Sequence, residues 1–479
     1  MPPTQRPNLL LITLDQLRFD TLGYAGHPVV DTPHIDALAR RGMVFDRAYV
    51  TAPVCIPARR TLLSGLHPDT HGLRYYEDGL EWTPPQTLPG LLSDAGYQTQ
   101  LVGKMHLHPQ GKRYGFDHVI LSETTRERPD SGFHERNDYI PWLRRMGEHG
   151  SATRHGANHW QGRPDVLEES LSHSSWLAEE AIDFLVNRRD PSCPFFMHLS
   201  FVHPHPPLTP PAPFWEKYAA RTMDPPLRGD WVEGEPWQPG TVPRSDTRGP
   251  FKPEAVADAR RGYYGLVEHV DACIAHVLDT YFEYGSARQQ EPLYILLTSD
   301  HGEMLGDHEL FSKTVPYESS AHIPYFISGY NVPLAAGRSD AFVTLEDVLP
   351  TFLDLAGVER PTGLDGNSLA AVVAGEPAPE RDCIDGVCGP HHWLRWDDWK
   401  YLCWPANGEE QLFHLGEDPG ELEDRSGDPE AGKALQVARE RMAPLLKQRL
   451  GQDAIPDFKP LAGRSPSVFR LLGGGANRK

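Results

Sequence analysis

Three short apolar runs are the features of this sequence that most constrain its fold: NLLLITL (8–14), PFFMHLSFV (194–202) and PLYILLTS (292–299). Continuous apolar runs of this length are typical of strands buried on both faces of a largely parallel sheet. Amphipathic helical periodicity occurs in the segments 34–42, 174–189 and 253–285. Because apolar runs and helical segments alternate along the chain, we expect an α/β fold with a mainly parallel sheet flanked by helices.

Length and a change of composition predict two domains. With 479 residues, of which 39% are hydrophobic, the chain exceeds what one small core usually holds. After the segment 364–380 the composition changes to the aromatic run WLRWDDWKYLCW and then to a polar, acidic helix. We therefore predict a large α/β domain over 1–375 and a smaller α+β domain over 376–479.

A stretch rich in Pro, Gly and Trp, residues 206–252, shows little periodicity and predicts a long loop region. Loops of this length in compact domains are usually functional lids or linkers. Trp231 and Trp237 in this stretch, and the aromatic segment 390–399, would either line a binding pocket or pack between the domains. The sequence favours neither interpretation over the other.

The charge of the chain limits the kinds of partner it can bind, and its cysteines indicate the compartment in which it works. The formal net charge of −20 disfavours nucleic acid and anionic membrane surfaces, so an anionic substrate would need a local cluster of cations. No apolar run is long enough to span a bilayer, and the N-terminus has no leader pattern. The six cysteines are scattered, as is typical of a reducing compartment. We predict a cytoplasmic protein without a membrane partner, and leave open whether it forms a homo-oligomer.

Acidic and imidazole side chains follow each of the apolar runs. Asp15 follows the first run, His205 the second, and Asp300 with His301 the third. The carboxyl ends of strands in an open α/β sheet are where ligands bind, so these side chains are expected to converge. Two carboxylates and an imidazole suit a divalent cation such as Mg²⁺, Mn²⁺ or Ca²⁺. Taken singly, Asp15 is equally typical of a turn or helix cap, and His205 of a solvated loop.

The segment PVCIPARRTLLSG (53–65) carries a cysteine at the expected start of a helix. Pro57 is typical of the first helical turn, which places Cys55 at or just before the helix N-terminus. Backbone N–H groups there favour an anion and would acidify a thiol. Arg59, one turn further on, is placed to bind a tetrahedral oxyanion. These features indicate a nucleophile in an anion pocket, and the alternative is an inert buried cysteine.

The sequence CIPAR (55–59) resembles the CxPxR motif of type I sulfatases, in which the cysteine is oxidised to formylglycine after translation. Further elements resemble the same family in the same order along nearly the whole chain. These elements are DTPHIDALARRGMVFDRAYV (31–50), GKMHL (103–107), PHPPLTPPAPF (204–214), SDHGEMLGDH (299–308), WKYL (399–402) and LFHLGEDPGELED (412–424).

This resemblance implies an alkaline-phosphatase-like fold, with a large mixed, mainly parallel sheet and a smaller C-terminal domain that carries a short antiparallel sheet. The implied reaction is hydrolysis of a sulfate monoester to an alcohol and inorganic sulfate. The implied cofactors are one divalent metal ion (Ca²⁺, Mn²⁺ or Mg²⁺) and formylglycine, which a formylglycine-generating enzyme would make from Cys55. The substrate would be a small-molecule or sugar sulfate ester.

The resemblance also implies a role for each matched residue. Cys55, once converted and hydrated, would be a geminal diol: one oxygen attacks sulfur, and loss of the proton from the other expels sulfate. The implied metal ligands are Asp15, Gln16, Cys55, Asp300 and His301. The other implied catalytic residues are Arg59 at the diol, Lys104 and Lys313 at the sulfate oxygens, and His205 and His106 at the leaving group and the second hydroxyl. His108 also lies in this element, but the family spacing selects His106.

One departure from the family pattern keeps a second reaction open. Many relatives carry two aspartates where this chain has Asp15 and Gln16, and phosphonate monoester hydrolases, which also use formylglycine, share the Asp-Gln version. In that group uncharged residues replace the lysine and histidine of the GKMH element, whereas this chain keeps Lys104 and His106. The sequence therefore favours a sulfatase, with phosphonate monoester or phosphodiester hydrolysis at the same site as the alternative.

Two further expectations concern turnover. Both reactions use similar oxyanion stabilisation, so promiscuity is expected in either case. A protein of this fold that binds sulfated or phosphorylated ligands without turnover would be expected to lose its nucleophile or metal ligands. Every matched position is intact here, which argues against such a binding protein.

Overall fold

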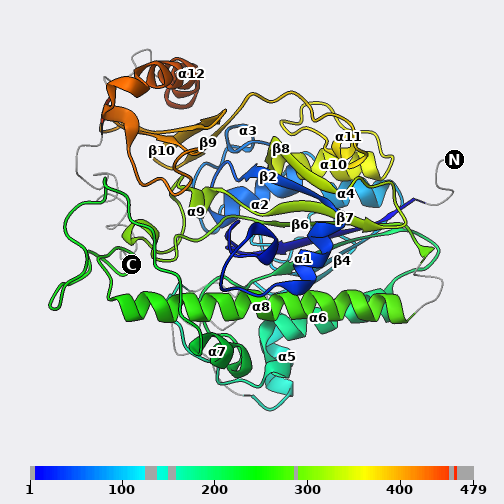
Figure 1. Ribbon diagram of the computed structural model, residues 1–479. Helices are drawn as coiled ribbons and strands as arrows, with labels where there is room; N and C mark the ends of the chain where they lie inside the picture. Colours follow the sequence, from blue (N-terminus) through cyan, green and yellow to red (C-terminus); the bar gives the residue numbers. More distant parts are fainter. Residues whose placement is uncertain (1–5, 124–136, 149–157, 285–289, 452–457, 461–479) are drawn as a thin grey trace.

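An eight-stranded sheet forms the centre of the computed structural model, in the order β4-β3-β5-β1-β6-β7-β2-β8 (Figure 1). Its strands are β1 (Asn8–Leu14), β2 (Met43–Tyr49), β3 (Gln98–Gly103), β4 (His118–Leu121), β5 (Phe195–Phe201), β6 (Leu293–Ser299), β7 (Tyr325–Tyr330) and β8 (Gly337–Thr344). Only β7 runs antiparallel to its neighbours among these strands. The structure describes residues 6–123, 137–148, 158–284, 290–451 and 458–460.

Helices cover both faces of this sheet (Figure 1). One face packs against α1 (Pro33–Arg40), α5 (Tyr139–Arg145), α6 (His173–Asp183) and α8 (Pro253–Glu283). The other packs against α2 (Cys55–Ser64), α4 (Leu88–Asp94), α10 (Val348–Leu355) and α11 (Ala370–Val373). In β1 the side chains of Leu10 and Ile12 enter the first core, and those of Leu9 and Leu11 the second. This burial on both faces explains why the strand is a continuous apolar run.

The predicted elements are confirmed with small shifts at their ends. β1 spans the predicted 8–14, β5 is one residue shorter than predicted at each end, and β6 begins one residue later than predicted. The periodic segment 174–189 forms α6 and then a π-helical turn over Phe184–Arg188. Within 206–252 the expectation of a loop is wrong at α7 (Ala212–Ala219). Pro213 stands in the first turn of α7, where proline favours a helix, and Tyr218 is buried.

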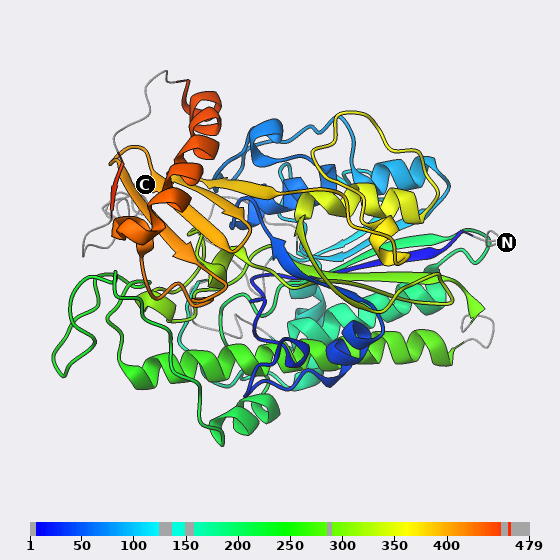
Figure 2. The same cartoon turned by 45° about the horizontal axis from the view of Figure 1, so that its top comes forward.

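The C-terminal part of the chain forms a second sheet of five strands, in the order β13-β12-β11-β10-β9. Its strands are β9 (Cys383–Cys388), β10 (His391–Trp396), β11 (Trp399–Trp404), β12 (Glu409–His414) and β13 (Lys459–Pro460). Pairing is antiparallel except between β12 and β13. The long helix α12 (Gly432–Leu450) lies against this sheet (Figure 2). The resemblance-based expectation of a second, antiparallel domain is thereby confirmed, while the division at residue 375 stays a prediction.

Alternate side chains of the small sheet face in opposite directions. Leu394 and Tyr401 pack against α12, whereas Trp393 and Leu402 face the larger domain. Trp231, from the 206–252 stretch, is buried in this second cluster. Trp231 and Trp393 therefore pack between the domains. Of the two roles that the sequence left open, a pocket wall or interdomain packing, these two residues have the second.

A buried ion-pair network crosses the same interface. Nζ of Lys400, on β11, lies 2.7 Å from Glu318 in α9 (Glu318–Ala321) and 2.9 Å from Glu421. Burial raises the pKa of Glu421 to about 7, against the effect of Lys400. Burial also opposes ionisation of Glu318, but Lys400 and His322 outweigh it and hold its pKa below the ordinary value. One buried lysine thus neutralises carboxylates that link the two domains.

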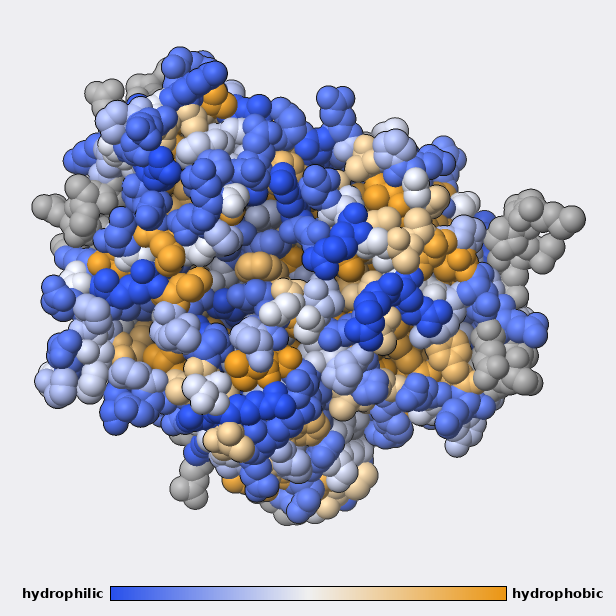
Figure 3. All heavy atoms as spheres, viewed as in Figure 1, coloured by the Kyte–Doolittle hydropathy of each residue, from blue (hydrophilic) through white to orange (hydrophobic). Residues whose placement is uncertain are grey.

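Figure 3 shows the surface of one face of the molecule. On the face seen in Figure 3, hydrophilic residues prevail and hydrophobic residues form small scattered patches. Among the described residues, no helix has both the length and the apolar character needed to cross a membrane. A remaining short helix, α3 (Pro68–His71), follows α2 in the chain.

We predict that Lys400→Met destabilises the fold because it leaves two carboxylates buried without their cation. Removing one partner of a buried ion pair costs about 3–5 kcal/mol. Since Glu421 can be protonated instead, we expect a loss of about 3 kcal/mol in the free energy of unfolding, measured by urea titration. Lys433→Met, at an exposed position of α12, is the matched control and should change this value by less than about 0.5 kcal/mol. Equal stability of the two variants would contradict the role of the network.

Candidate active site

The carboxyl ends of three neighbouring strands meet at one edge of the main sheet. The strands β5, β1 and β6 are adjacent and remain in register up to their last residues. Asp15 directly follows β1, Asp300 directly follows β6, and His205 lies a few residues beyond β5. Two further segments reach these residues: the N-terminus of α2, with Cys55, and the residue after β3, Lys104.

Cys55 is the first residue of α2 and is buried, as the sequence predicted for the start of this helix. Its Sγ lies 3.1 Å from Nε2 of His301. Burial and the carboxylate of Asp15 act to raise the pKa of the thiol. The positive groups of Lys313, Lys104 and His301 outweigh them and leave this pKa below its ordinary value. The environment therefore favours the reactive form of the cysteine.

The two carboxylates each use one oxygen for a cation and turn the other toward a common centre. Oδ2 of Asp15 lies 2.6 Å from Nζ of Lys104 and 3.1 Å from Nη2 of Arg59. Oδ2 of Asp300 accepts a hydrogen bond from Nε of Arg59 at 2.9 Å. The Oδ1 atoms of both carboxylates lie 3.8 Å from Nε2 of His301. The second oxygens thus face the imidazole that also contacts Cys55.

This centre fits a divalent cation. Donor atoms of Asp15, Cys55, Asp300 and His301 lie within 4.8 Å of one another, and all four residues are buried. Oδ1 of Asp15 has no hydrogen-bond partner among the residues that the structure describes, which is unfavourable for a buried carboxylate oxygen unless another group binds it. Nδ1–H of His301 donates to the carbonyl of Gly302 at 2.9 Å, which turns Nε2 toward the centre, where it could ligate a cation in exchange for its proton. Hard oxygens and one imidazole are suitable ligands for such an ion.

Arg59 and Lys104 are buried yet remain charged. Burial opposes the charged form of both side chains, but the carboxylates of Asp300 and Asp15 raise the pKa of Arg59, and Asp15 raises that of Lys104. Arg59 also donates to the carbonyl of Lys104 at 2.8 Å and to Oγ of Ser200 at 3.1 Å. These bonds fix the guanidinium between the strand ends, and they hold two positive charges beside Cys55.

Lys313, His205 and Gln16 form a second polar group at this edge. Nζ of Lys313 lies 3.1 Å from Nε2 of His205 and also donates to the amide oxygen of Gln16. Nδ1–H of His205 donates to the carbonyl of Pro206 at 2.7 Å, so its Nε2 accepts from Lys313. Burial and Lys313 hold the pKa of His205 well below its ordinary value, and the imidazole is neutral. The amide nitrogen of Gln16 donates to Glu303, and metal ligation by Gln16 stays a prediction.

His106 lies within the field of the same charges. Burial, then Lys104 and Arg59, hold its pKa well below the ordinary value. Its backbone N–H donates to the carboxylate of Glu123, at 2.7 Å to Oε2, and its φ of 55° lies in the left-handed region. His108, by contrast, lies with Nε2 at 2.9 Å from Asp78, a residue outside the predicted site. No sequence pattern indicated Glu123, whose carboxylate holds the backbone of His106.

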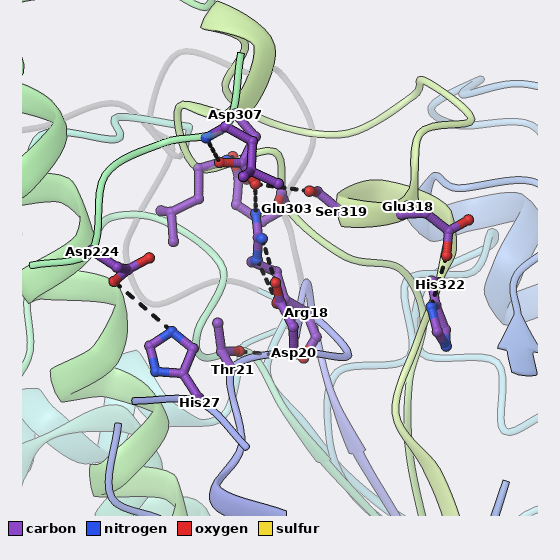
Figure 4. Close-up of polar contacts among 12 residues, drawn as sticks. Arg18, Asp20, Thr21, His27, Asp224, Glu303, Asp307, Glu318, Ser319 and His322 are labelled. Carbon is purple, nitrogen blue, oxygen red and sulfur yellow. Dashed lines mark hydrogen bonds and ion pairs between the residues drawn. The ribbon is translucent and has the colours of Figure 1, made fainter. Parts of the chain in front are cut away.

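Polar contacts of Arg18, Glu303 and Asp307 position the chain that follows β6 (Figure 4). Arg18 donates to the carbonyl of Glu303 at 2.9 Å and lies 2.8 Å from Asp307. Asp307 accepts a hydrogen bond from Ser319 at 2.9 Å, and the carboxylate of Glu303 accepts from the backbone N–H of Leu305 at 2.9 Å. These contacts fix the chain after β6, from which Asp300 and Lys313 extend. Glu303 stands within the element 299–308 that the sequence indicated, and Arg18 lies three residues after Asp15, but their positioning role was not predicted.

Comparisons with known proteins agree with this arrangement. The family model described as "Sulfatase" matches residues 7–358, and the model "N-sulphoglucosamine sulphohydrolase, C-terminal" matches residues 306–448. An arylsulfatase of Clostridium perfringens is 35% identical over 87% of this chain and 89% of its own length. A choline-sulfatase of Rhizobium meliloti is 30% identical over 89% of this chain and 83% of its own length.

Solved structures show the same fold. A phosphonate monoester hydrolase of Agrobacterium radiobacter superposes with a TM-score of 0.74 at 24% identity, over 93% of this chain and 96% of that one. A protein in complex with its substrate D-glucosamine-2-N,6-O-disulfate superposes with a TM-score of 0.73 at 23% identity, over 95% of this chain and 100% of that one. Since the sulfatase model covers most of the sequence and the curated relatives match over most of their length, this chain belongs to the sulfatase family and is a sulfuric ester hydrolase.

Proposed function

We propose that the chain hydrolyses a sulfate monoester to an alcohol and inorganic sulfate, using formylglycine made from Cys55 and one divalent metal ion. Asp15, Asp300 and His301 would hold the ion, with Gln16 beside them. The observation that carries this proposal is the buried group of four donor residues, which lies against Arg59, Lys104 and Lys313. A nucleophile position, a cation site and a set of positive charges thus coincide at one edge of the sheet.

The metal and the modified residue would supply the nucleophile. A bound Ca²⁺, Mn²⁺ or Mg²⁺ would lower the pKa of a coordinated hydroxyl toward neutral pH. Formylglycine at position 55 would supply, once hydrated, one hydroxyl for attack on sulfur and a second hydroxyl whose loss of a proton would release sulfate. The Pro57 and Arg59 positions that follow Cys55 match the family motif, and we propose that a formylglycine-generating enzyme converts this cysteine.

The cations of the chain would bind the sulfate group. Charge on the transferring group spreads over its oxygens, and fixed positive groups stabilise that charge best where water is excluded. Lys104 is buried beside Asp15, and Lys313 lies beside His205. We assign sulfate oxygens to these two lysines. Arg59, held between both carboxylates, would orient the modified residue.

The two histidines would move protons. His205 and His106 are neutral in the field of the neighbouring cations. His106 would offer a lone pair to a hydroxyl, whereas the lone pair of His205 accepts from Lys313. Nε2 of His205 accepts from Lys313, and a proton can pass across this contact toward the oxygen of the leaving alcohol. His106 would then serve the second hydroxyl of the modified residue.

The substrate class is proposed from chemistry and from the relatives. An aryl, small-molecule or sugar sulfate ester fits a site of this kind, and the curated relatives carry the names arylsulfatase and choline-sulfatase. Phosphonate monoester hydrolysis is a related activity that Gln16 favours, and we propose it as a slower side reaction. The cytoplasmic location and any homo-oligomer stay predictions.

We predict that Cys55→Ala abolishes hydrolysis of 4-nitrophenyl sulfate, because no other residue would supply the aldehyde. The protein would be produced together with a formylglycine-generating enzyme, and mass spectrometry of the peptide that contains residue 55 should show the aldehyde in the wild type. Cys193→Ala, at a half-buried cysteine, is the matched control and should keep full activity. A substantial residual rate in Cys55→Ala would show that Cys55 is not the nucleophile.

Lys104→Ala should lower kcat/KM for 4-nitrophenyl sulfate by roughly 10²–10³, the usual cost of removing one group that stabilises developing charge. Lys252→Ala, at an exposed position before α8, removes the same charge and should leave kcat/KM unchanged. Urea midpoints of both variants would separate a loss of catalysis from a loss of folding. Wild-type kcat/KM in a folded Lys104→Ala protein would remove Lys104 from the site.

A further inference from the structure

A cavity of about 200 Å³ opens beside the proposed reaction centre. Lys313 lines this cavity, and the same lysine contacts His205 and Gln16 at the edge of the sheet. The neighbouring Thr314 donates its backbone N–H to the carbonyl of Pro53, two residues before Cys55. A substrate with its sulfate group at Cys55 can therefore extend its alcohol part past Lys313 into this space.

Part of the cavity wall is a turn that carries Arg248. The backbone N–H of Phe311 donates to the carbonyl of Thr247 at 3.0 Å, which joins the turn to the segment that carries Lys313. Trp160 stacks on Phe311 with ring centroids 4.0 Å apart and donates its indole N–H to the carbonyl of Asp246. The turn is thus held from two sides, and Arg248 has a defined place in the wall.

The cavity is positively charged in an acidic protein. Arg248 and Lys313 are among its lining residues, and none of the described residues that line it is Asp or Glu, although the formal net charge of the chain is −20. Glu309, which precedes the lining segment 310–315, binds Arg228 at 3.0 Å and Arg244 at 2.9 Å. Glu309 is therefore already engaged with two other arginines.

The remaining lining of the cavity is suited to a polar ring. Tyr75 contributes an aromatic face, and Ser245, Thr247 and Thr314 contribute hydroxyl groups. Half-burial and the nearby charge of Arg244 lower the pKa of Arg248 to about 10, so the guanidinium is charged at neutral pH but incompletely solvated. An anion that entered the cavity would offset this cost.

We propose that this cavity binds a second oxyanion, a carboxylate or a sulfate, on the alcohol part of the substrate, and that Arg248 selects for it. Lys313 would then stand between the two anionic groups, with the reacting sulfate on one side and the second oxyanion on the other. The planar guanidinium of Arg248 suits two-point binding of either group. This inference rests on the proposed function, because it takes the reacting sulfate to lie at Cys55.

Matched pairs of substrates test the proposal. In the carboxylate arm, 3- and 4-carboxyphenyl sulfate are compared with the corresponding carbamoylphenyl sulfates, which have the same shape without the charge. In the sulfate arm, hydroquinone bis-sulfate is compared with hydroquinone monosulfate. We expect the anionic member of at least one pair to have a kcat/KM higher by about tenfold, mainly through a lower KM, and the arm that shows it identifies the oxyanion.

Variants assign this preference to Arg248. Arg248→Met should reduce the ratio of kcat/KM for the anionic substrate to kcat/KM for its neutral partner to about one, and leave kcat for 4-nitrophenyl sulfate unchanged. Arg248→Lys should retain part of this ratio. Arg360→Met, at an exposed arginine outside the cavity, removes the same charge and should keep the full ratio. A wild-type ratio near one in both arms, or a full ratio in Arg248→Met, would overturn the proposal.

A binding measurement separates failure of this inference from failure of the proposed function. Dissociation constants for the same pairs are measured by calorimetry with Cys55→Ala protein, which does not require turnover. If the wild type fails to hydrolyse any of these sulfates, the proposed function is wrong, and the calorimetric ratio still decides on Arg248. If 4-nitrophenyl sulfate is hydrolysed but charged and neutral partners bind equally, only the inference about Arg248 is wrong.

Discussion

The site depends on one buried arginine that joins two strand ends. Arg59 contacts Asp15 after β1 and Asp300 after β6, and all three side chains are almost fully buried. Two carboxylates brought together without such a partner would repel each other and take up protons. Arg59 contacts one oxygen of each carboxylate, and Lys104 adds a second cation at Asp15, so the other oxygen of each carboxylate is left to face His301 beside Cys55. The arrangement of donor groups thus follows from a single residue one turn into α2.

Most of the fold could be predicted from local patterns. The apolar runs predicted β1, β5 and β6 to within one residue because strands buried on both faces must be apolar throughout. Helix α7 was missed because a short helix between prolines has too few residues to show periodicity. The packing of Trp231 against the small sheet was left open, since it depends on a contact between segments far apart in the chain.

Motifs predicted the proposed site residues, but not the residues that hold them in place. Each motif marks a side chain at the end of a strand or helix, and convergence follows from the parallel sheet. Glu303 accepts a hydrogen bond from the side-chain amide of Gln16, and Arg18 donates to the backbone carbonyl of Glu303 in the chain after β6. Contacts of this kind leave no pattern in a single sequence. Arg248 also depends on tertiary placement, because only the turn packed on Phe311 brings it to the cavity beside Lys313.

The most direct test of the account is the ratio of kcat/KM for 4-nitrophenyl sulfate to that for a phenylphosphonate monoester, using protein made with the formylglycine-generating enzyme and supplied with Mn²⁺ or Ca²⁺. Lys104, buried against Asp15, adds a cation that suits the sulfuryl group, whereas Gln16 removes one negative charge near the metal. The account predicts a ratio well above one. A ratio well below one would contradict it and would make the chain a phosphonate monoester hydrolase in which Gln16, rather than Lys104, determines the reaction.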